Sequence, residues 1–257
     1  MIARAMARTW GAAWQEVRAN RRAFWTQLIA MAVNDIVWVG FWTLFFRRVD
    51  TLRGWDLDRV ILLFAILATT AGLVVGLLAN ARSIGTLATT GALDAALALP
   101  TPTLLHLLLR KIDTTNLGDL VFGLTLFAIR GHPTPARTVT FVFVVLSASV
   151  LAAGFLVMAG SLSFFVGRNE AGELGFQSLF LFANYPIDVF GGFMKTFLFV
   201  VVPAGFVTGV PARLIDDFSL PWAAALVGAA IAFALGGWTM FNLGLRRYTS
   251  GAVWTNA

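Results

Sequence analysis

The sequence predicts an all-α integral membrane protein with six transmembrane helices and almost no folded mass outside the bilayer. Of its 257 residues, 58% are hydrophobic and only 12% are charged, and the mean hydropathy is +0.80. A soluble domain typically carries about 25% charged residues. A transmembrane helix needs about 20 mostly apolar residues, and the chain contains several such runs between short polar loops. We therefore expect a single transmembrane domain over residues 1–257.

A basic amphipathic segment opens the chain. Over residues 1–22, apolar side chains such as Met6, Trp10 and Trp14 recur at helical spacing between arginines. This pattern is typical of a helix that lies in the lipid headgroup region. The net charge of +6 and the pI near 11 favour membrane lipids as a partner and not nucleic acid, because no basic and aromatic patch stands outside the predicted spans. We read this segment as mature protein and predict an interfacial helix; an ordinary basic segment beside the first span is the alternative.

The first predicted span, residues 23–46, carries a carboxylate near its middle. Asn34 and Asp35 stand there among apolar residues. An ionisable side chain at this depth usually faces the interior of a helix bundle or a water-filled cavity. Asp35 is therefore a candidate functional residue, and a purely structural bond to a neighbouring helix is the alternative.

The second predicted span, residues 60–80, is rich in small side chains. Thr69 and Thr70 precede Gly72 and Gly76. Glycines four residues apart allow two helices to approach closely.

A polar stretch over residues 82–113 follows, and it is the feature around which we expect the chain to be organised. Two very apolar runs flank it, yet it contains five charged residues, and Pro100 and Pro102 break its middle. We predict two short amphipathic helices that lie on the membrane as a hairpin. Such a hairpin offers a compact surface to a partner protein.

Four further spans complete the prediction, at residues 114–129, 138–165, 195–210 and 222–243. Asp119 stands close to the start of the third span, so we place it at the membrane interface. Residues 168–194 are half polar, and we predict an interfacial helix there that ends at the Tyr185-Pro186 break. Pro203 interrupts the fifth span, and we expect a kinked or broken helix.

The basic residues are distributed unequally over the two sides. With six spans, both termini lie on one side, and that side carries most of the 19 Lys and Arg residues. We expect a multi-pass protein of the inner or plasma membrane. The positive-inside rule then places both termini and the hairpin on its cytoplasmic side.

Several kinds of chemistry are missing from the sequence. It has no cysteine, and its two histidines, His106 and His132, lie in different loops away from acidic clusters, so we expect no metal site. No Gly is followed by Lys, so the chain has no phosphate-binding GxxxxGK[ST] loop. We expect no catalytic residue and no cofactor in this chain.

Two local motifs resemble a known family. The stretch from Gly91 to Leu97, GALDAAL, is followed by Pro100 and Pro102, and the Tyr185-Pro186 pair is followed by Phe199-Val-Val-Val-Pro203 and Pro211-Ala212. Together with the expected topology, these motifs resemble the permeases of type-2 ABC exporters, in the branch once catalogued only as a domain of unknown function.

The resemblance implies a half-transporter. Such a permease pairs with a second permease subunit, often a different chain, in a heteromeric complex, and two cytoplasmic ABC ATPase subunits that hold ATP and Mg drive it. Residues 84–99 would be the coupling helix in a groove of the ATPase. The residues expected at this contact are Arg82, Leu87, Leu93, Asp94 and Leu97. For Asp94, a helix N-cap or a solvated charge is an equal alternative.

The substrate class follows from the aromatic content. The chain has 23 Phe and 9 Trp, which suggests a hydrophobic or amphipathic substrate such as a drug, lipid or secreted metabolite. The expected translocation-pathway residues, in the inner-leaflet part of the spans, are Asn34, Asp35, Thr69, Thr70, Phe199, Pro203 and Phe206. The alternative function is an ion- or proton-coupled secondary transporter that uses Asp35, and an intramembrane enzyme is a third, weaker one.

Overall fold

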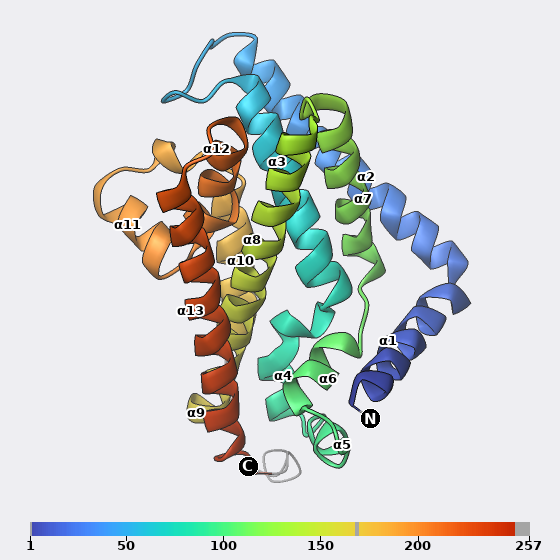
Figure 1. Ribbon diagram of the computed structural model, residues 1–257. Coiled ribbons are helices and arrows are strands. Elements are labelled where there is room, and N and C mark those ends of the chain that lie inside the picture. The colour runs from blue at the N-terminus through green and yellow to red at the C-terminus, as the bar shows by residue number, and fades with distance from the viewer. Residues whose placement is uncertain (1, 168–169, 250–257) are drawn as a thin grey trace.

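The computed structural model describes residues 2–167 and 170–249, and within these ranges the chain forms a bundle of helices without a β-sheet (Figure 1). An all-α membrane protein was predicted, and the fold class is confirmed. In chain order the elements are α1 (Ile2–Ala19), α2 (Arg21–Phe46), α3 (Leu57–Ala71), η1 (Gly72–Leu77), η2 (Ala79–Ser83), α4 (Ile84–Thr89), α5 (Asp94–Leu97), α6 (Thr103–Leu109), α7 (Thr114–Arg130), α8 (Pro135–Ser161), α9 (Ser163–Val166), α10 (Ala171–Ala183), η3 (Ile187–Val189), α11 (Gly192–Val200), η4 (Gly205–Gly209), α12 (Val210–Asp216) and α13 (Leu220–Leu245).

Six lengths of helix run between the two ends of the bundle: α2, α3 continued by η1, α7, α8, α10 and α13 (Figure 1). We call the end with residues 79–113 the hairpin end and the other the loop end. Four segments are long and apolar enough to cross a membrane by themselves: Arg21–Phe46, Leu57–Leu77, Pro135–Val166 and Leu220–Leu245. These segments and α7 agree with five of the predicted spans to within a few residues.

The amphipathic helix α1 lies beside the hairpin and is tied to it. Met6 and Ala13 are buried, and the Thr9 Oγ1 and His106 Nδ1 atoms are 3.2 Å apart. Burial and, secondarily, the charge of Arg110 lower the pKa of His106, so its ring is neutral at pH 7. The placement of α1 in the headgroup region stays a prediction.

Span two bends where it meets α7. The predicted glycine pair lies in η1, a π-helical turn, and a Cβ on Gly72 would lie 2.4 Å from the Leu120 Cβ. Only glycine allows this approach of the two backbones. The backbone N–H of Asp113 donates to the Gly76 carbonyl (2.8 Å), which fixes the start of α7 against the bend.

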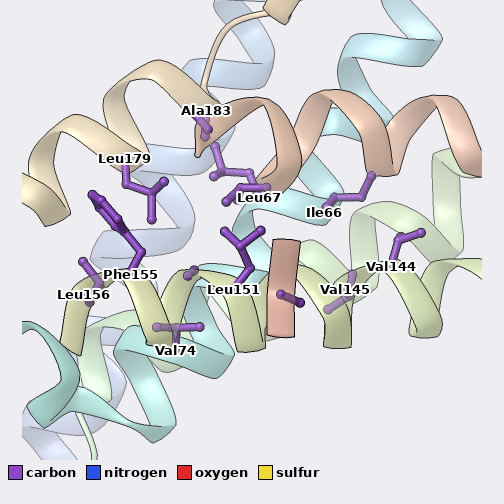
Figure 2. Close-up of a cluster of buried hydrophobic side chains, with 14 of the residues drawn as sticks. Ile66, Leu67, Val74, Val144, Val145, Leu151, Phe155, Leu156, Leu179 and Ala183 are labelled. Atoms are coloured by element: carbon purple, nitrogen blue, oxygen red, sulfur yellow. The ribbon is translucent and has the colours of Figure 1, made fainter. Parts of the chain in front are cut away.

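Helix α8 is the centre of the core. It packs against α3, α10 and α13, and its buried side chains Val144, Leu151 and Phe155 face α3 and α10 (Figure 2). At the α13 contact, a Cβ on Gly154 would lie 2.5 Å from the Phe233 carbonyl carbon. In contrast, α2 turns an apolar face outward along almost its whole length.

The break predicted in the fifth span is confirmed, but the helices on its two sides do not form the fifth length between the two ends of the bundle. The fifth helix that runs between the hairpin end and the loop end is α10. We had expected an interfacial helix at this place in the chain. Gly172 lies against the Arg82 carbonyl at the hairpin end, and Ala183, at the other end of α10, accepts a hydrogen bond from Thr208 (3.0 Å). Arg168, part of the predicted interfacial helix, lies outside the described residues.

The segment predicted as the fifth span is instead a re-entrant hairpin at the loop end. Its helices, α11 and η4 with α12, meet at an angle of 77°. Asp188 precedes the segment and Arg213 lies near its end, and these two residues form an ion pair. Because Asp188 and Arg213 are in contact, both ends of the segment lie at the loop end. Lys195, which we had placed on the side of the termini, pairs with Asp188 and so lies at the loop end.

Candidate functional sites at the hairpin and within the spans

The hairpin is built from short helical pieces that breakers separate. Thr90 ends α4, Gly91 turns the chain with a φ of 77°, and Pro100 and Pro102 separate α5 from α6. A side chain at Gly91 would be strained in this left-handed conformation. The predicted coupling helix over residues 84–99 is thus two helices, α4 and α5, joined by a turn.

One face of the hairpin is locked onto the spans. A Cβ on Gly85 would lie 2.5 Å from the Ser163 Oγ, and Ile84 is fully buried against Gly160 of α8. The Asn80 side chain donates to the Leu107 carbonyl (2.8 Å) and so joins the start of the hairpin to α6. A force on the hairpin is therefore transmitted to α8.

The other face of the hairpin is apolar and open. Leu97 and Leu99 are 42% and 43% exposed, although two neighbouring residues, Leu93 and Ala96, are completely buried. The Asp94 carboxylate accepts a hydrogen bond from the Tyr248 hydroxyl (2.8 Å). Exposed leucines at the tip of an otherwise anchored element are typical of a protein contact.

The predicted coupling residues divide between these two faces. Leu97 and Asp94 lie at the surface. Leu93 is in the core, and Leu87 is half buried, so neither offers a large surface. Arg82, which we had expected to reach an acidic residue of a partner, forms an ion pair with Asp113 (3.2 Å) and lies over the Phe176 ring of α10.

A second site lies between α2, α3, α7 and α10, within the spans. Here the carboxyl groups of Asp35 and Asp119 lie close to each other. Two ionised carboxylates repel each other strongly away from water, so this pair needs a proton or another cation between them. Asn116 donates to Asp119 (2.9 Å) and holds it in place.

The pair faces a cavity of about 140 Å³. Its polar wall consists of the two carboxyls and the amides of Asn34, Asn116 and Asn184, and aromatic side chains form much of the rest. The lining residues are Met31, Asn34, Asp35, Trp38, Phe64, Leu67, Ala68, Ala71, Asn116, Asp119, Phe176, Phe180 and Asn184. The site can take a small polar or charged group at membrane depth.

The other predicted pathway residues lie elsewhere. Thr69 and Thr70 are buried, and Thr69 touches the Gly123 position on α7 and not the cavity. Phe199, Pro203 and Phe206 lie at the bend of the re-entrant hairpin, where the two phenylalanine rings are 5.1 Å apart. They belong to the half of the bundle next to the loop end and do not line the cavity with Asp35.

Asp119 was assigned to the membrane interface, and this was wrong. It is only 3% exposed and meets Asp35, the carboxylate that the sequence singled out. A signal was present: Asn116 and Asp119 are three residues apart and so share one face of α7. Asn184 carried no such signal, because its helix was not predicted to be a span.

The loop end carries a cluster of charges. Asp188 accepts hydrogen bonds from the Trp55 indole (2.9 Å), from Lys195 (2.7 Å) and from Arg213. Burial opposes ionisation of Asp188, but these donors outweigh it and hold its pKa at about 2. Asp216 binds Arg59 (2.9 Å) and Arg137 (3.2 Å) close by. The cluster joins the first loop, the re-entrant hairpin and the start of α8.

Within residues 2–167 and 170–249, no three His, Asp or Glu side chains are grouped so that they could hold a metal ion. The arrangement thus offers a docking surface and a polar intramembrane cavity. Neither resembles a catalytic constellation.

Comparison with known proteins agrees with this geometry. The sequence model of a family described as "ABC-2 family transporter protein" matches residues 30–252. No curated protein and no solved structure matches the chain. The match covers five of the six helices that run between the ends of the bundle in full, and α2 from residue 30 onward. We conclude that this chain belongs to the ABC-2 transporter family as a transmembrane component, not itself catalytic.

Proposed function

We propose that the chain is the permease subunit of an ABC exporter in a cell membrane, that it forms half of the translocation pathway, and that separate cytoplasmic ATPase subunits drive it. The observation that carries this proposal is the two-faced hairpin. Leu93 and Ala96 anchor it in the core, while Leu97 and Leu99 stay exposed. In this proposal both termini and the hairpin are cytoplasmic.

The hairpin couples ATP binding to the spans through a shift of populations. Closure of an ATPase dimer favours one position of the hairpin, and the spans must follow, because Ile84 and Gly85 are packed against α8 and α9. A substrate that binds one arrangement more tightly biases the same equilibrium.

The intramembrane cavity is the proposed polar part of the pathway. An amphipathic substrate would place its polar group near Asp35 and Asp119 and its apolar part against Trp38, Phe64 or Phe176. In this assignment, Asn34 and Asp35 remain in the predicted set of pathway residues. Asp119, Asn116 and Asn184 are added to it.

A second permease subunit would complete the pathway. The exposed apolar face of α2, which includes Trp25, Ile29, Val33 and Ile36, supports this expectation because none of the described helices covers it. A partner of different sequence is proposed, as in the heteromeric members that the motifs resemble.

Copurification tests the proposal. We would isolate the tagged chain from its native membranes in mild detergent and identify bound proteins that carry a GxxxxGK[ST] motif. Wild type should bring down such an ATPase, and the double substitution Leu97→Arg with Leu99→Arg should lose it. Phe218→Arg, which changes an even more exposed apolar residue at the loop end, should keep the bound ATPase. Wild-type protein free of any ATPase would contradict the proposal.

The alternative, a proton-coupled secondary transporter, is favoured by one observation, the contact between Asp35 and Asp119. It predicts that the purified chain, reconstituted alone, moves protons across vesicles and that Asp119→Asn abolishes this movement. In the ABC proposal, the chain alone moves no protons.

A further inference from the structure

A long apolar groove lies on the opposite side of span two from the carboxylate cavity. It has a volume of about 610 Å³ and runs between η1 with α6 on one side and α8 with α13 on the other. Its lining residues are Trp10, Leu73, Leu77, Leu78, Leu104, Leu108, Leu109, Leu146, Ser149, Val150, Ala153, Gly154, Val157, Ala234 and Trp238. The single polar side chain in this lining, Ser149, makes no hydrogen bond among the described residues.

The groove follows one leaflet of the bilayer. Along α8 it extends from Leu146, near the middle of the helix, to Val157 near the hairpin end. At about 1.5 Å per residue this length is about 16 Å, which is half of the roughly 30 Å thickness of a hydrocarbon core. The groove therefore matches the depth that one layer of acyl chains occupies.

The walls of the groove are closed behind and open to the side. The close contact of Gly154 with Phe233 and Ala234 forms the floor, since it leaves no gap between α8 and α13. Val150 and Trp238, on the rim, are well exposed. A chain molecule can thus enter laterally from the membrane.

Positively charged side chains lie at one end of the groove, the hairpin end. Arg110 and Lys111 directly follow Leu109, which lines the groove at the hairpin end. Both are exposed, and neither forms an ion pair within the described part of the chain. The nearby acidic residue Asp113 is already paired with Arg82. Two uncompensated cations beside an apolar groove match a headgroup phosphate with its acyl chain.

We propose that this groove is a binding site for an anionic phospholipid of the leaflet at the hairpin end. One acyl chain lies along α8 between Leu146 and Val157, and the phosphate binds Arg110 and Lys111. The substrate is a less suitable occupant, because the polar groups that could orient it face the other cavity. A second permease is also less suitable, because its helix would leave the two cations without a counter-charge.

The bound lipid has a structural consequence. It fills the space between α6, which belongs to the hairpin, and the pair of α8 and α13. It therefore supports the hairpin against the spans. This inference does not depend on the proposed ATPase, since it concerns the chain alone.

Lipid add-back tests the site. The full-length chain is purified in detergent and delipidated, and its Tm is measured against added phosphatidylglycerol or phosphatidylcholine. We expect phosphatidylglycerol to raise the Tm at lower concentration. Arg110→Gln with Lys111→Gln should weaken its apparent affinity about 30-fold, since each cation near a phosphate contributes about a fivefold gain. The matched pair Arg47→Gln with Arg48→Gln, exposed at the loop end, should leave it unchanged.

A second variant tests the acyl chain. Ala153→Phe fills the groove from its half-buried wall and should abolish the stabilisation by both lipids. Should that variant fail to fold, the paired basic variants decide alone. Equal effects of the two lipids on wild type, or an equal loss with the Arg47 and Arg48 pair, would overturn the proposal.

Discussion

The two ends of the bundle are held together by different forces. Five ion pairs of the described residues lie at the loop end, where Asp188 and Asp216 join the first loop, α8 and the re-entrant hairpin. At the hairpin end Arg82 pairs with Asp113, and the contacts with the spans are mainly apolar packing. Directional charge contacts fix the loops relative to one another, whereas the apolar packing of the hairpin joins it to α8 and leaves its outer face open to a partner. From this difference we infer that the loop end, which we call the cap, keeps a fixed structure and that the hairpin end is the part that moves.

The largest effect is expected for Asp188→Asn. The change leaves Lys195 and Arg213 without their shared counter-charge, and the difference between a pKa of about 2 and the ordinary 3.8 corresponds to ~2 kcal/mol. The Tm in detergent should fall by about 4–8 °C. Asp50→Asn, an exposed residue of the first loop at the same end of the bundle, is the control and should change the Tm little. An unchanged Tm for Asp188→Asn would show that the cluster does not hold the cap.

The same residue gives the cap a defined pH dependence. Because the pKa of Asp188 is lowered, its stabilisation is complete above about pH 4 and is lost as the pH falls through about 2. The difference in Tm between wild type and Asp188→Asn should therefore be constant from pH 7 to 5 and vanish near pH 2. A difference that disappears already at pH 5 contradicts the assigned pKa.

A smaller loss of stability is expected at the hairpin end. Arg82→Gln removes a partly exposed ion pair and the contact with the Phe176 ring, which together contribute about 1 kcal/mol. Its main effect should be functional, because Arg82 joins the start of the hairpin to α10. Substrate-stimulated ATP hydrolysis by the complex should drop, while the Tm stays nearly unchanged. A clear fall in Tm with unchanged ATP hydrolysis would show that Arg82 only stabilises the fold.

The smallest effect is expected for Arg130→Gln. Its ion pair with Asp58 is at the loop end too, but both side chains are largely exposed, so the loss should stay below about 0.5 kcal/mol. This variant separates buried from exposed charge contacts. A Tm change as large as that of Asp188→Asn would mean that the whole cap, and not the Asp188 cluster, is the stabilising unit.

Most of the fold could be predicted because long apolar runs have few alternatives in a bilayer. The fifth helix of the bundle, α10, was not predicted as a span for the same physical reason. Helix α10 has only 13 residues and begins beside Glu170 and Glu173, whereas the re-entrant segment that follows is more apolar. Hydropathy indicates which residues avoid water. A segment that is buried within the protein is as apolar as a transmembrane span, although it does not cross the membrane.

The sites were predictable only in part. Asp35 was found because a charge in the middle of a span is costly wherever it lies. Its contact with Asp119 depends on how α2 packs on α7, which no local pattern of the sequence contains. Likewise, the order of apolar residues in the hairpin does not show that Leu93 turns inward and Leu97 outward, because α5 is a single turn between two breakers.

The central claim, that an ATPase acts on the hairpin end, is tested most directly by photo-crosslinking in the native membrane. A photoreactive phenylalanine analogue is placed at Leu97, Leu99 or, as control, Phe218, and the crosslinked proteins are identified by mass spectrometry. We predict an ATP-binding subunit crosslinked at Leu97 and Leu99 and none at Phe218. An ATPase found at Phe218, or at none of the three positions, would contradict the account.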